Sequence, residues 1–162
     1  MRPVRFLPPM AVEVGQEAPE FTLRDENGQE VALSSLRGRN VVLIFFPAAF
    51  SRICTNEFHA STDLAGKYGA AGAEVFGVSV DSPYALKAFK RDENLAVRFL
   101  SDFHPKGAMS EQYGAYIPEA GVATRATYVI DRDGRVAYKA VNHPGEMRDQ
   151  GAILDALAGC PV

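Results

Sequence analysis

The chain has 162 residues, 47% of them hydrophobic, which is enough for one domain with a full core and too few for two ordinary ones. With 17 basic and 20 acidic residues the net charge is -3, and the absence of a Lys/Arg cluster argues against nucleic-acid binding. Two widely separated cysteines and three scattered histidines form neither a disulfide framework nor a metal-ligand pattern. We therefore expect a reducing environment and no metal site.

The first ten residues, MRPVRFLPPM, do not have the pattern of a targeting segment. Three prolines interrupt them before any apolar stretch of signal-peptide length, and no transmembrane run follows. This pattern predicts a cytoplasmic protein with no membrane partner. We expect a flexible extension over residues 1–10, with Met10 as an alternative start, and a single domain over residues 11–162.

The first half of the chain predicts a hairpin, a central strand and a helix. The segments 21–23 and 31–33 flank Asn27-Gly28, a dipeptide that favours a tight turn. Residues 40–46 (NVVLIFF) have no polar alternation, as expected for a strand covered on both faces, and Pro47 ends that strand. A helix is expected from Ser51 to about Tyr68, with Ser51 as its N-cap.

The second half predicts alternating strands and helices and then another hairpin. The expected elements are a strand at 74–80, a helix at 82–92, a strand at 97–100, a short helix near 106–113, strands at 126–130 and 135–138, and a helix at about 146–158. Asp133-Gly134 lies between the last two strands and favours a tight turn.

This order of elements predicts an α/β protein with a thioredoxin-like fold. Such a fold has a central mixed β-sheet flanked by helices, here with an N-terminal β-hairpin added. A flavodoxin-like doubly wound sheet is the competing interpretation. The Asp133-Gly134 hairpin weighs against it, because successive strands of an all-parallel sheet need a long crossover.

Cys54 lies in the expected first turn of a helix, where a thiol can become a reactive nucleophile. Unpaired backbone N–H groups and the positive end of the helix dipole stabilise an anion there. Glu57, one helical turn later, would disfavour a thiolate unless a cation neutralises it. A second positive group is therefore needed, and Arg125, just before the strand ATYVI, is a candidate because a strand end would aim its side chain.

These residues resemble the peroxiredoxin family. Pro47, Ser51 and Cys54 match its motif P-x-x-x-(T/S)-x-x-C, and Arg125 lies in the sequence context of its active-site arginine. The resemblance extends over nearly the whole chain, through VGQEAPEFTLRDENGQEVALSSLRG, FFPAAFSRIC, SDFHPKGAMSEQYG, RATYVIDRDG and HPGEMRDQ. The last of these segments, together with FFPAAFSRIC, look most like the one-cysteine group typified by alkyl hydroperoxide reductase E.

The resemblance implies a thiol-dependent peroxidase that acts on hydrogen peroxide and organic hydroperoxides and requires no metal or organic cofactor. Cys54 would attack the peroxide and become a sulfenic acid. The Ser51 hydroxyl, the Cys54 N–H and the Arg125 guanidinium would hold the peroxide, while Pro47 would shield the sulfur and Glu57 would orient the arginine. The group also implies a homodimer, by analogy alone.

The sequence leaves open how the sulfenic acid returns to the thiol. Three roles of Cys160 stay open: resolving the sulfenic acid by a disulfide within the chain or across a dimer, being a spare thiol, or forming adventitious intermolecular bridges. Peroxiredoxins of the bacterioferritin-comigratory type often carry a resolving cysteine five residues after the first cysteine. In this chain that position is His59. We expect a one-cysteine mechanism, with an external thiol or a redoxin as reductant. A thioredoxin-like oxidoreductase would need C-x-x-C where this chain has C-T-N-E, and a redox sensor without turnover remains an alternative.

Overall fold

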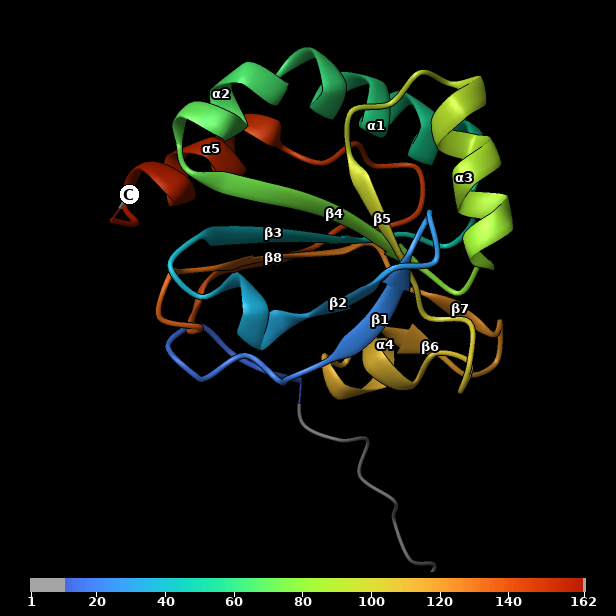
Figure 1. The fold of residues 1–162 in the computed structure, drawn as a ribbon, viewed down its shortest axis with the longest axis horizontal. Helices are drawn as coiled ribbons and strands as arrows, with labels where there is room; N and C mark the ends of the chain where they lie inside the picture. The colour runs from blue at the N-terminus through green and yellow to red at the C-terminus, as the bar shows by residue number, and fades with distance from the viewer. Residues whose placement is uncertain (1–10, 162) are drawn as a thin grey trace, which may run out of the picture.

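A seven-stranded mixed sheet forms the centre of the structure, a computed structural model that describes residues 11–161 (Figure 1). The strand order is β2-β1-β5-β4-β3-β8-β9. The strands are β1 (Thr22–Asp25), β2 (Glu30–Ala32), β3 (Asn40–Phe45), β4 (Ala73–Ser79), β5 (Arg98–Ser101), β8 (Ala126–Ile130) and β9 (Val136–Val141). The expected extension over residues 1–10, including the alternative start at Met10, lies outside the described residues.

The pairing of the strands confirms the thioredoxin-like mixed sheet. Strands β3, β4 and β5 are parallel, whereas β8 pairs antiparallel with β3. Both tight-turn dipeptides connect antiparallel neighbours, β1 with β2 and β8 with β9. The N-terminal hairpin is therefore confirmed, and it joins the sheet through β1 and β5.

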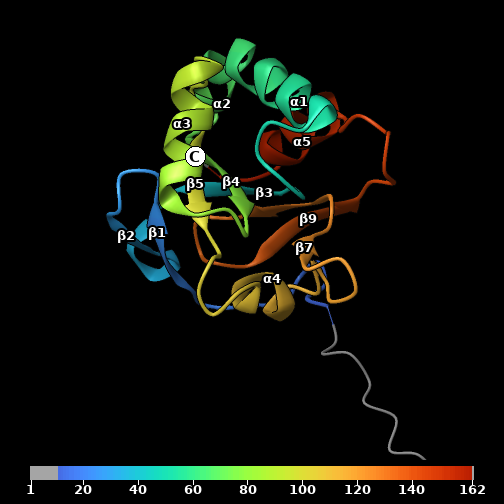
Figure 2. The ribbon, with the colours of Figure 1, turned by 90° about the vertical axis from the view of Figure 1, so that its right-hand side faces the viewer.

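The helices cover the two faces of the sheet unequally (Figure 2). They are α1 (Arg52–Asp63), α2 (Ala65–Ala70), α3 (Pro83–Asp92), α4 (Ala108–Gln112) and α5 (Gln150–Ala158), with a 3-10 turn at Leu33–Leu36. Helices α1, α2, α3 and α5 lie over one face, and α4 lies on the other. Each face has its own hydrophobic core, because the buried residues of β3 alternate between the two. No helix in the described part of the chain is long and apolar enough to cross a membrane.

Two expected helices have different bounds in the structure, and one hairpin was not expected. The helix expected from Ser51 to Tyr68 divides at Leu64 into α1 and α2. The last helix begins at Gln150 rather than near Glu146, because the Asp149 side chain caps it by accepting from the Ala152 N–H at 2.9 Å. Two short strands, β6 (Tyr116–Ile117) and β7 (Val122–Ala123), form a separate hairpin that the sequence pattern did not indicate.

An aromatic cluster seats α1 on the sheet. Phe58 of α1 packs edge-to-face on Phe46 and Phe99, with ring centroids 4.8 and 5.0 Å apart. Gly77 of β4 allows this approach, because a Cβ atom there would lie 2.7 Å from Phe99 and 2.9 Å from Phe58. The N-terminus of α1 is thereby held above the end of β3.

Candidate active site

The loop between β3 and α1 carries the predicted motif and ends at Ser51. Ser51 has the extended backbone of an N-cap residue, but its side chain does not cap the helix. Its hydroxyl instead donates to the Ala48 carbonyl at 2.9 Å. The expected N-cap position is confirmed, and the expected hydroxyl cap is wrong because the loop's own carbonyl competes for the group.

Cys54 lies in the first turn of α1, with its side chain buried at 2% exposure. The helix bonds begin one residue later, where the Thr55 N–H donates to the Ser51 carbonyl at 2.9 Å. The Cys54 N–H has no hydrogen-bond partner among residues 11–161. A free backbone donor therefore lies on the same residue as the thiol, as expected for the first turn of a helix.

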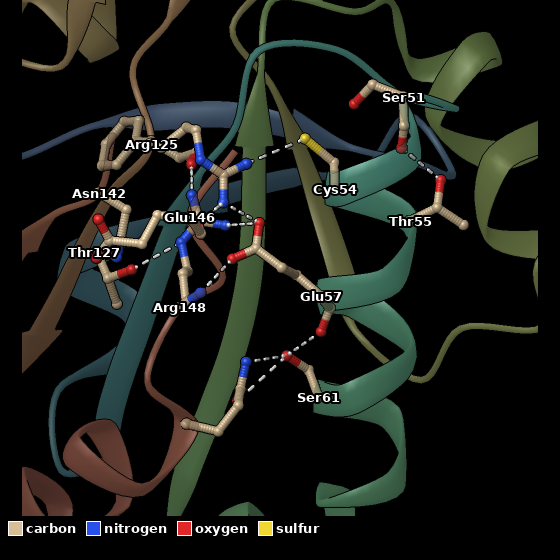
Figure 3. A network of polar contacts seen from close by, with 12 residues as sticks. Ser51, Cys54, Thr55, Glu57, Ser61, Arg125, Thr127, Asn142, Glu146 and Arg148 are labelled. Carbon is tan, nitrogen blue, oxygen red and sulfur yellow. Dashed lines mark hydrogen bonds and ion pairs between the residues drawn. The ribbon is translucent and has the colours of Figure 1, made fainter. Parts of the chain in front are cut away.

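Arg125 comes from 71 positions further along the chain and reaches the sulfur (Figure 3). Its Nη1 donates to Cys54 Sγ at 3.9 Å, at the long end of the range for a sulfur acceptor. Its Nη2 donates to Glu57 Oε1 at 2.5 Å and to the Glu146 carbonyl at 2.8 Å. The structure therefore brings Cys54, Glu57 and Arg125 together, as the sequence analysis expected.

Glu57 binds a second arginine that the sequence analysis did not identify. Arg148 donates its backbone N–H to Glu57 Oε2 at 2.8 Å and its Nη1 to Oε1 at 3.1 Å. The Arg148 side chain also donates to the Thr127 hydroxyl and to the Phe45 carbonyl at the end of β3. Burial lowers the pKa of Arg148 to about 10, so this residue remains charged at neutral pH.

The buried cluster beside Cys54 carries a net positive charge. Glu57, Arg125 and Arg148 are 1, 6 and 5% exposed, respectively. Two guanidinium groups and one carboxylate leave one uncompensated positive charge in a region that water does not solvate. That charge lies beside the Cys54 sulfur, where it stabilises negative charge that develops during a reaction.

No local signal in the sequence could have identified Arg148. It lies in HPGEMRDQ, a segment in which a helix was expected to begin and which instead forms a turn and an irregular stretch before α5. A general argument would have indicated that a second cation was required, because a buried carboxylate needs more partners than one arginine supplies. The chain has many arginines, and only the fold shows which one is near.

Pro47 and His59 lie near this cluster in the sequence but are not part of it. Pro47 begins the loop after the sheet and is half-buried, so its shielding of the sulfur stays a prediction. His59 faces outward from α1 and contacts Glu93 at 3.0 Å. Among residues 11–161 no group of three or more metal-binding side chains comes together.

Cys160 lies at the opposite end of β3 from Cys54. Its neighbour Pro161 accepts from Asn40 at the start of β3, whereas the Arg148 side chain in the Cys54 cluster binds Phe45 at the end of that strand. These two strand ends are roughly 17 Å apart at about 3.3 Å per residue. A disulfide needs Cα atoms within about 7 Å, so a bond within one chain would require a large rearrangement.

The environment of Cys160 also makes its sulfur a poor nucleophile. The side chain is 8% exposed, and its Sγ–H contacts the Ala156 carbonyl at 3.4 Å. Burial raises the pKa of the Cys160 thiol, and the negative charge of Asp131 raises it further. Little of it is therefore thiolate at neutral pH.

Comparison with known proteins places this site in a family. Residues 14–139 match the model of the AhpC/TSA family. Alkyl hydroperoxide reductase E of Mycobacterium tuberculosis is 40% identical over 148 residues, which cover 91% of this chain and 97% of the relative. A putative peroxiredoxin of Synechocystis is 36% identical over 142 residues, which cover 82% of this chain and 70% of the relative.

Solved structures of two such proteins superpose on most of the chain. Peroxidoxin BcpB from Mycobacterium tuberculosis has a TM-score of 0.82 at 28% identity, covering 93% of this chain and 99% of that one. The reduced 2-Cys peroxiredoxin of Plasmodium vivax has a TM-score of 0.81 at 29% identity, covering 90% of this chain and 80% of that one. The chain therefore belongs to the AhpC/TSA family and is a peroxiredoxin similar to alkyl hydroperoxide reductase E.

Proposed function

We propose that this protein is a thiol-dependent peroxidase that reduces hydrogen peroxide and organic hydroperoxides through Cys54. The observation that carries the proposal is the buried contact between Cys54 Sγ and Arg125 Nη1, 3.9 Å apart, within a cluster of two arginines and one glutamate. The names of its relatives, alkyl hydroperoxide reductase E and peroxiredoxin, agree with this chemistry.

The reaction transfers one oxygen atom to sulfur. The Cys54 thiolate attacks the terminal oxygen of the peroxide, so that an S–O bond forms while the O–O bond breaks. Sulfur is oxidised to the sulfenic acid, and the departing alkoxide or hydroxide takes a proton and leaves as alcohol or water.

Donors that stabilise the departing oxygen are needed for a fast reaction, because a thiolate alone reacts slowly. The Cys54 N–H has no partner among the described residues, and neither does the buried Arg125 Nε. Neither donor would have to break an existing hydrogen bond in order to bind a peroxide oxygen. The Ser51 hydroxyl must first turn away from the Ala48 carbonyl before it can donate.

A one-cysteine cycle with an external reductant fits the placement of the two thiols. Cys160 is buried and lies at the far end of β3 from Cys54, so an incoming thiol is the better reductant. A first thiol condenses with the sulfenic acid, releasing water and forming a mixed disulfide. A second thiol then attacks that disulfide, is itself oxidised, and regenerates Cys54.

Steady-state consumption of peroxide with a supplied thiol tests this function. We expect turnover in the wild type and in Cys160→Ser, and none above background in Cys54→Ser, because only Cys54 has the activating cluster. Reaction of Cys54 with a single equivalent of peroxide without turnover under any thiol or redoxin would instead favour a redox sensor. Equal loss of turnover in Cys160→Ser would favour the two-cysteine alternative.

We also propose a homodimer in a reducing, cytoplasmic setting. Large apolar side chains are exposed around the end of the molecule that carries the Cys54 loop, among them Phe50 at 50%, Tyr84 at 87% and Phe103 at 56%. Covering them would remove apolar surface from water. Analytical ultracentrifugation should show a dimer at micromolar concentration, and a monomer throughout would contradict this proposal.

A further inference from the structure

The loop that carries the peroxide-binding motif has a single hydrogen-bonded anchor outside itself and α1. Within the described residues, only the Ala49 N–H of positions 47–50 donates to another element, and its acceptor is Asp81 Oδ2 at 2.8 Å. The other bonds of the loop are internal, from the Ser51 hydroxyl and N–H to the Ala48 carbonyl. The conformation of the loop therefore depends on one carboxylate.

The loop needs such an anchor because its backbone is strained. Phe50 has φ +67°, in the left-handed region that a bulky residue rarely adopts. Its ring packs on Phe89 with centroids 5.1 Å apart but remains half exposed. A strained residue persists only where its surroundings hold it, and the bond from Ala49 to Asp81 lies directly beside Phe50.

Asp81 is itself held rigidly at the end of β4. The same oxygen, Oδ2, accepts from the buried Ser79 hydroxyl at 2.7 Å, and the Asp81 carbonyl accepts from the Ser101 hydroxyl at 2.6 Å. Asp81 is thus fixed to both β4 and β5 while its carboxylate reaches the loop. Asp81 therefore links the Cys54 loop to a rigid part of the sheet.

We propose that Asp81 is a positioning residue that keeps the loop from Pro47 to Ser51 closed over Cys54. The proposal rests on the proposed function for its catalytic consequence. With the bond in place, the loop keeps its conformation up to Ser51, and the Cys54 side chain stays 2% exposed. Without it, the strained loop relaxes, the donors of Ser51 and Cys54 lose their alignment and the sulfur becomes accessible to solvent.

Two substitutions at Asp81 separate the hydrogen bond from the charge. Asp81→Ala removes the acceptor. Asp81→Asn keeps one oxygen that can accept from both Ala49 and Ser79, and its NH₂ group replaces Oδ1, which has no partner among the described residues. The matched control is Asp131→Ala, because Asp131 accepts two backbone N–H bonds in the β8–β9 turn, at the other end of β3.

The test uses two rates in a Cys160→Ser background, so that only Cys54 reacts. The first is the second-order rate constant for oxidation of reduced Cys54 by hydrogen peroxide, and the second is the rate of its alkylation by iodoacetamide. For Asp81→Ala we expect oxidation to slow by about tenfold or more and alkylation to accelerate, whereas Asp81→Asn stays within about threefold of the parent. Asp131→Ala should change neither rate, although it also loses stability.

A purely structural role for Asp81 predicts a different result. In that case Asp81→Ala would lower the unfolding midpoint, as Asp131→Ala does, and leave both rates of the folded protein unchanged, which would overturn the proposal. If Asp81→Ala does not fold, Ser79→Ala serves instead, since loss of the Ser79 hydroxyl loosens Asp81 and should shift both rates in the same directions. If the parent protein fails to react with peroxide, the proposed function fails. The alkylation rates would still test whether Asp81 holds the loop in place.

Discussion

Replacing Arg125 by lysine should lower the rate constant for oxidation of Cys54 by peroxide about 100- to 1000-fold. The guanidinium donates to Cys54 and Glu57 at once through a planar fork, and it keeps its Nε donor free. An ammonium group has the same charge but cannot make these contacts together, and loss of one aligned donor to a developing oxyanion costs about this factor. Stopped-flow measurement of single-turnover oxidation gives the rate directly.

The control for this substitution is Arg98→Lys. Arg98 also binds two carboxylates, Glu74 and Asp25, but lies at the sheet surface. Its replacement should leave the oxidation rate unchanged. A rate for Arg125→Lys within about threefold of the wild type would show that the arginine does not hold the peroxide.

Replacing Glu57 by glutamine should cost about 3–5 kcal/mol of the free energy of unfolding, because two buried arginines lose their carboxylate. Glu57 accepts from Arg125 once and from Arg148 twice, and all three residues are almost fully buried. Urea unfolding measures the loss, which corresponds to a fall of roughly 10 °C in Tm for a chain of this size.

The matched control for Glu57 is Glu74→Gln. Glu74 also binds two arginines, Arg39 and Arg98, but Arg39 is 66% exposed, so water solvates the cluster. The expected cost there is about 1 kcal/mol or less. Equal losses for the two glutamates would contradict the view that burial makes the Glu57 cluster important for stability.

The sequence could predict elements whose signals are local. Asn27-Gly28 and Asp133-Gly134 each marked a hairpin, and the uninterrupted apolar run of β3 marked a strand covered on both faces. Ser82 and Pro83 marked the start of α3, where the Ser82 hydroxyl accepts from the Ala85 N–H. In each case a backbone requirement is met by residues next to one another in the chain.

The rest depended on contacts between distant segments. The predicted start of the last helix was too early, because the Arg148 N–H donates to Glu57 and α5 begins only at Gln150. The Ser51 hydroxyl donates to the Ala48 carbonyl in the loop and does not cap the helix. The Asp81 carboxylate accepts from the Ala49 N–H, 32 positions away in the sequence. Which acceptor a donor binds in such cases depends on the folded structure, because only the fold brings the two groups together.

The site residues that lie in local sequence motifs could be predicted, and the others could not. The motif residues Pro47, Ser51 and Cys54 lie within one loop and first turn, and Arg125 precedes a strand end, so a pattern could mark them. Arg148 lies in an irregular segment with no pattern of its own. Only the folded structure places Arg148 in the cluster, where it donates to both carboxylate oxygens of Glu57.

The most direct test of the central claim is intact and peptide mass spectrometry of the reduced protein after one equivalent of hydrogen peroxide, without reductant. If Cys54 forms a stable sulfenic acid, we expect the protein to gain one oxygen atom without dimedone. With dimedone present we expect a thioether adduct on Cys54, formed with loss of water, and in both samples Cys160 stays a free thiol. A disulfide between Cys54 and Cys160, or oxygen added to Cys160 first, would contradict the one-cysteine mechanism at Cys54.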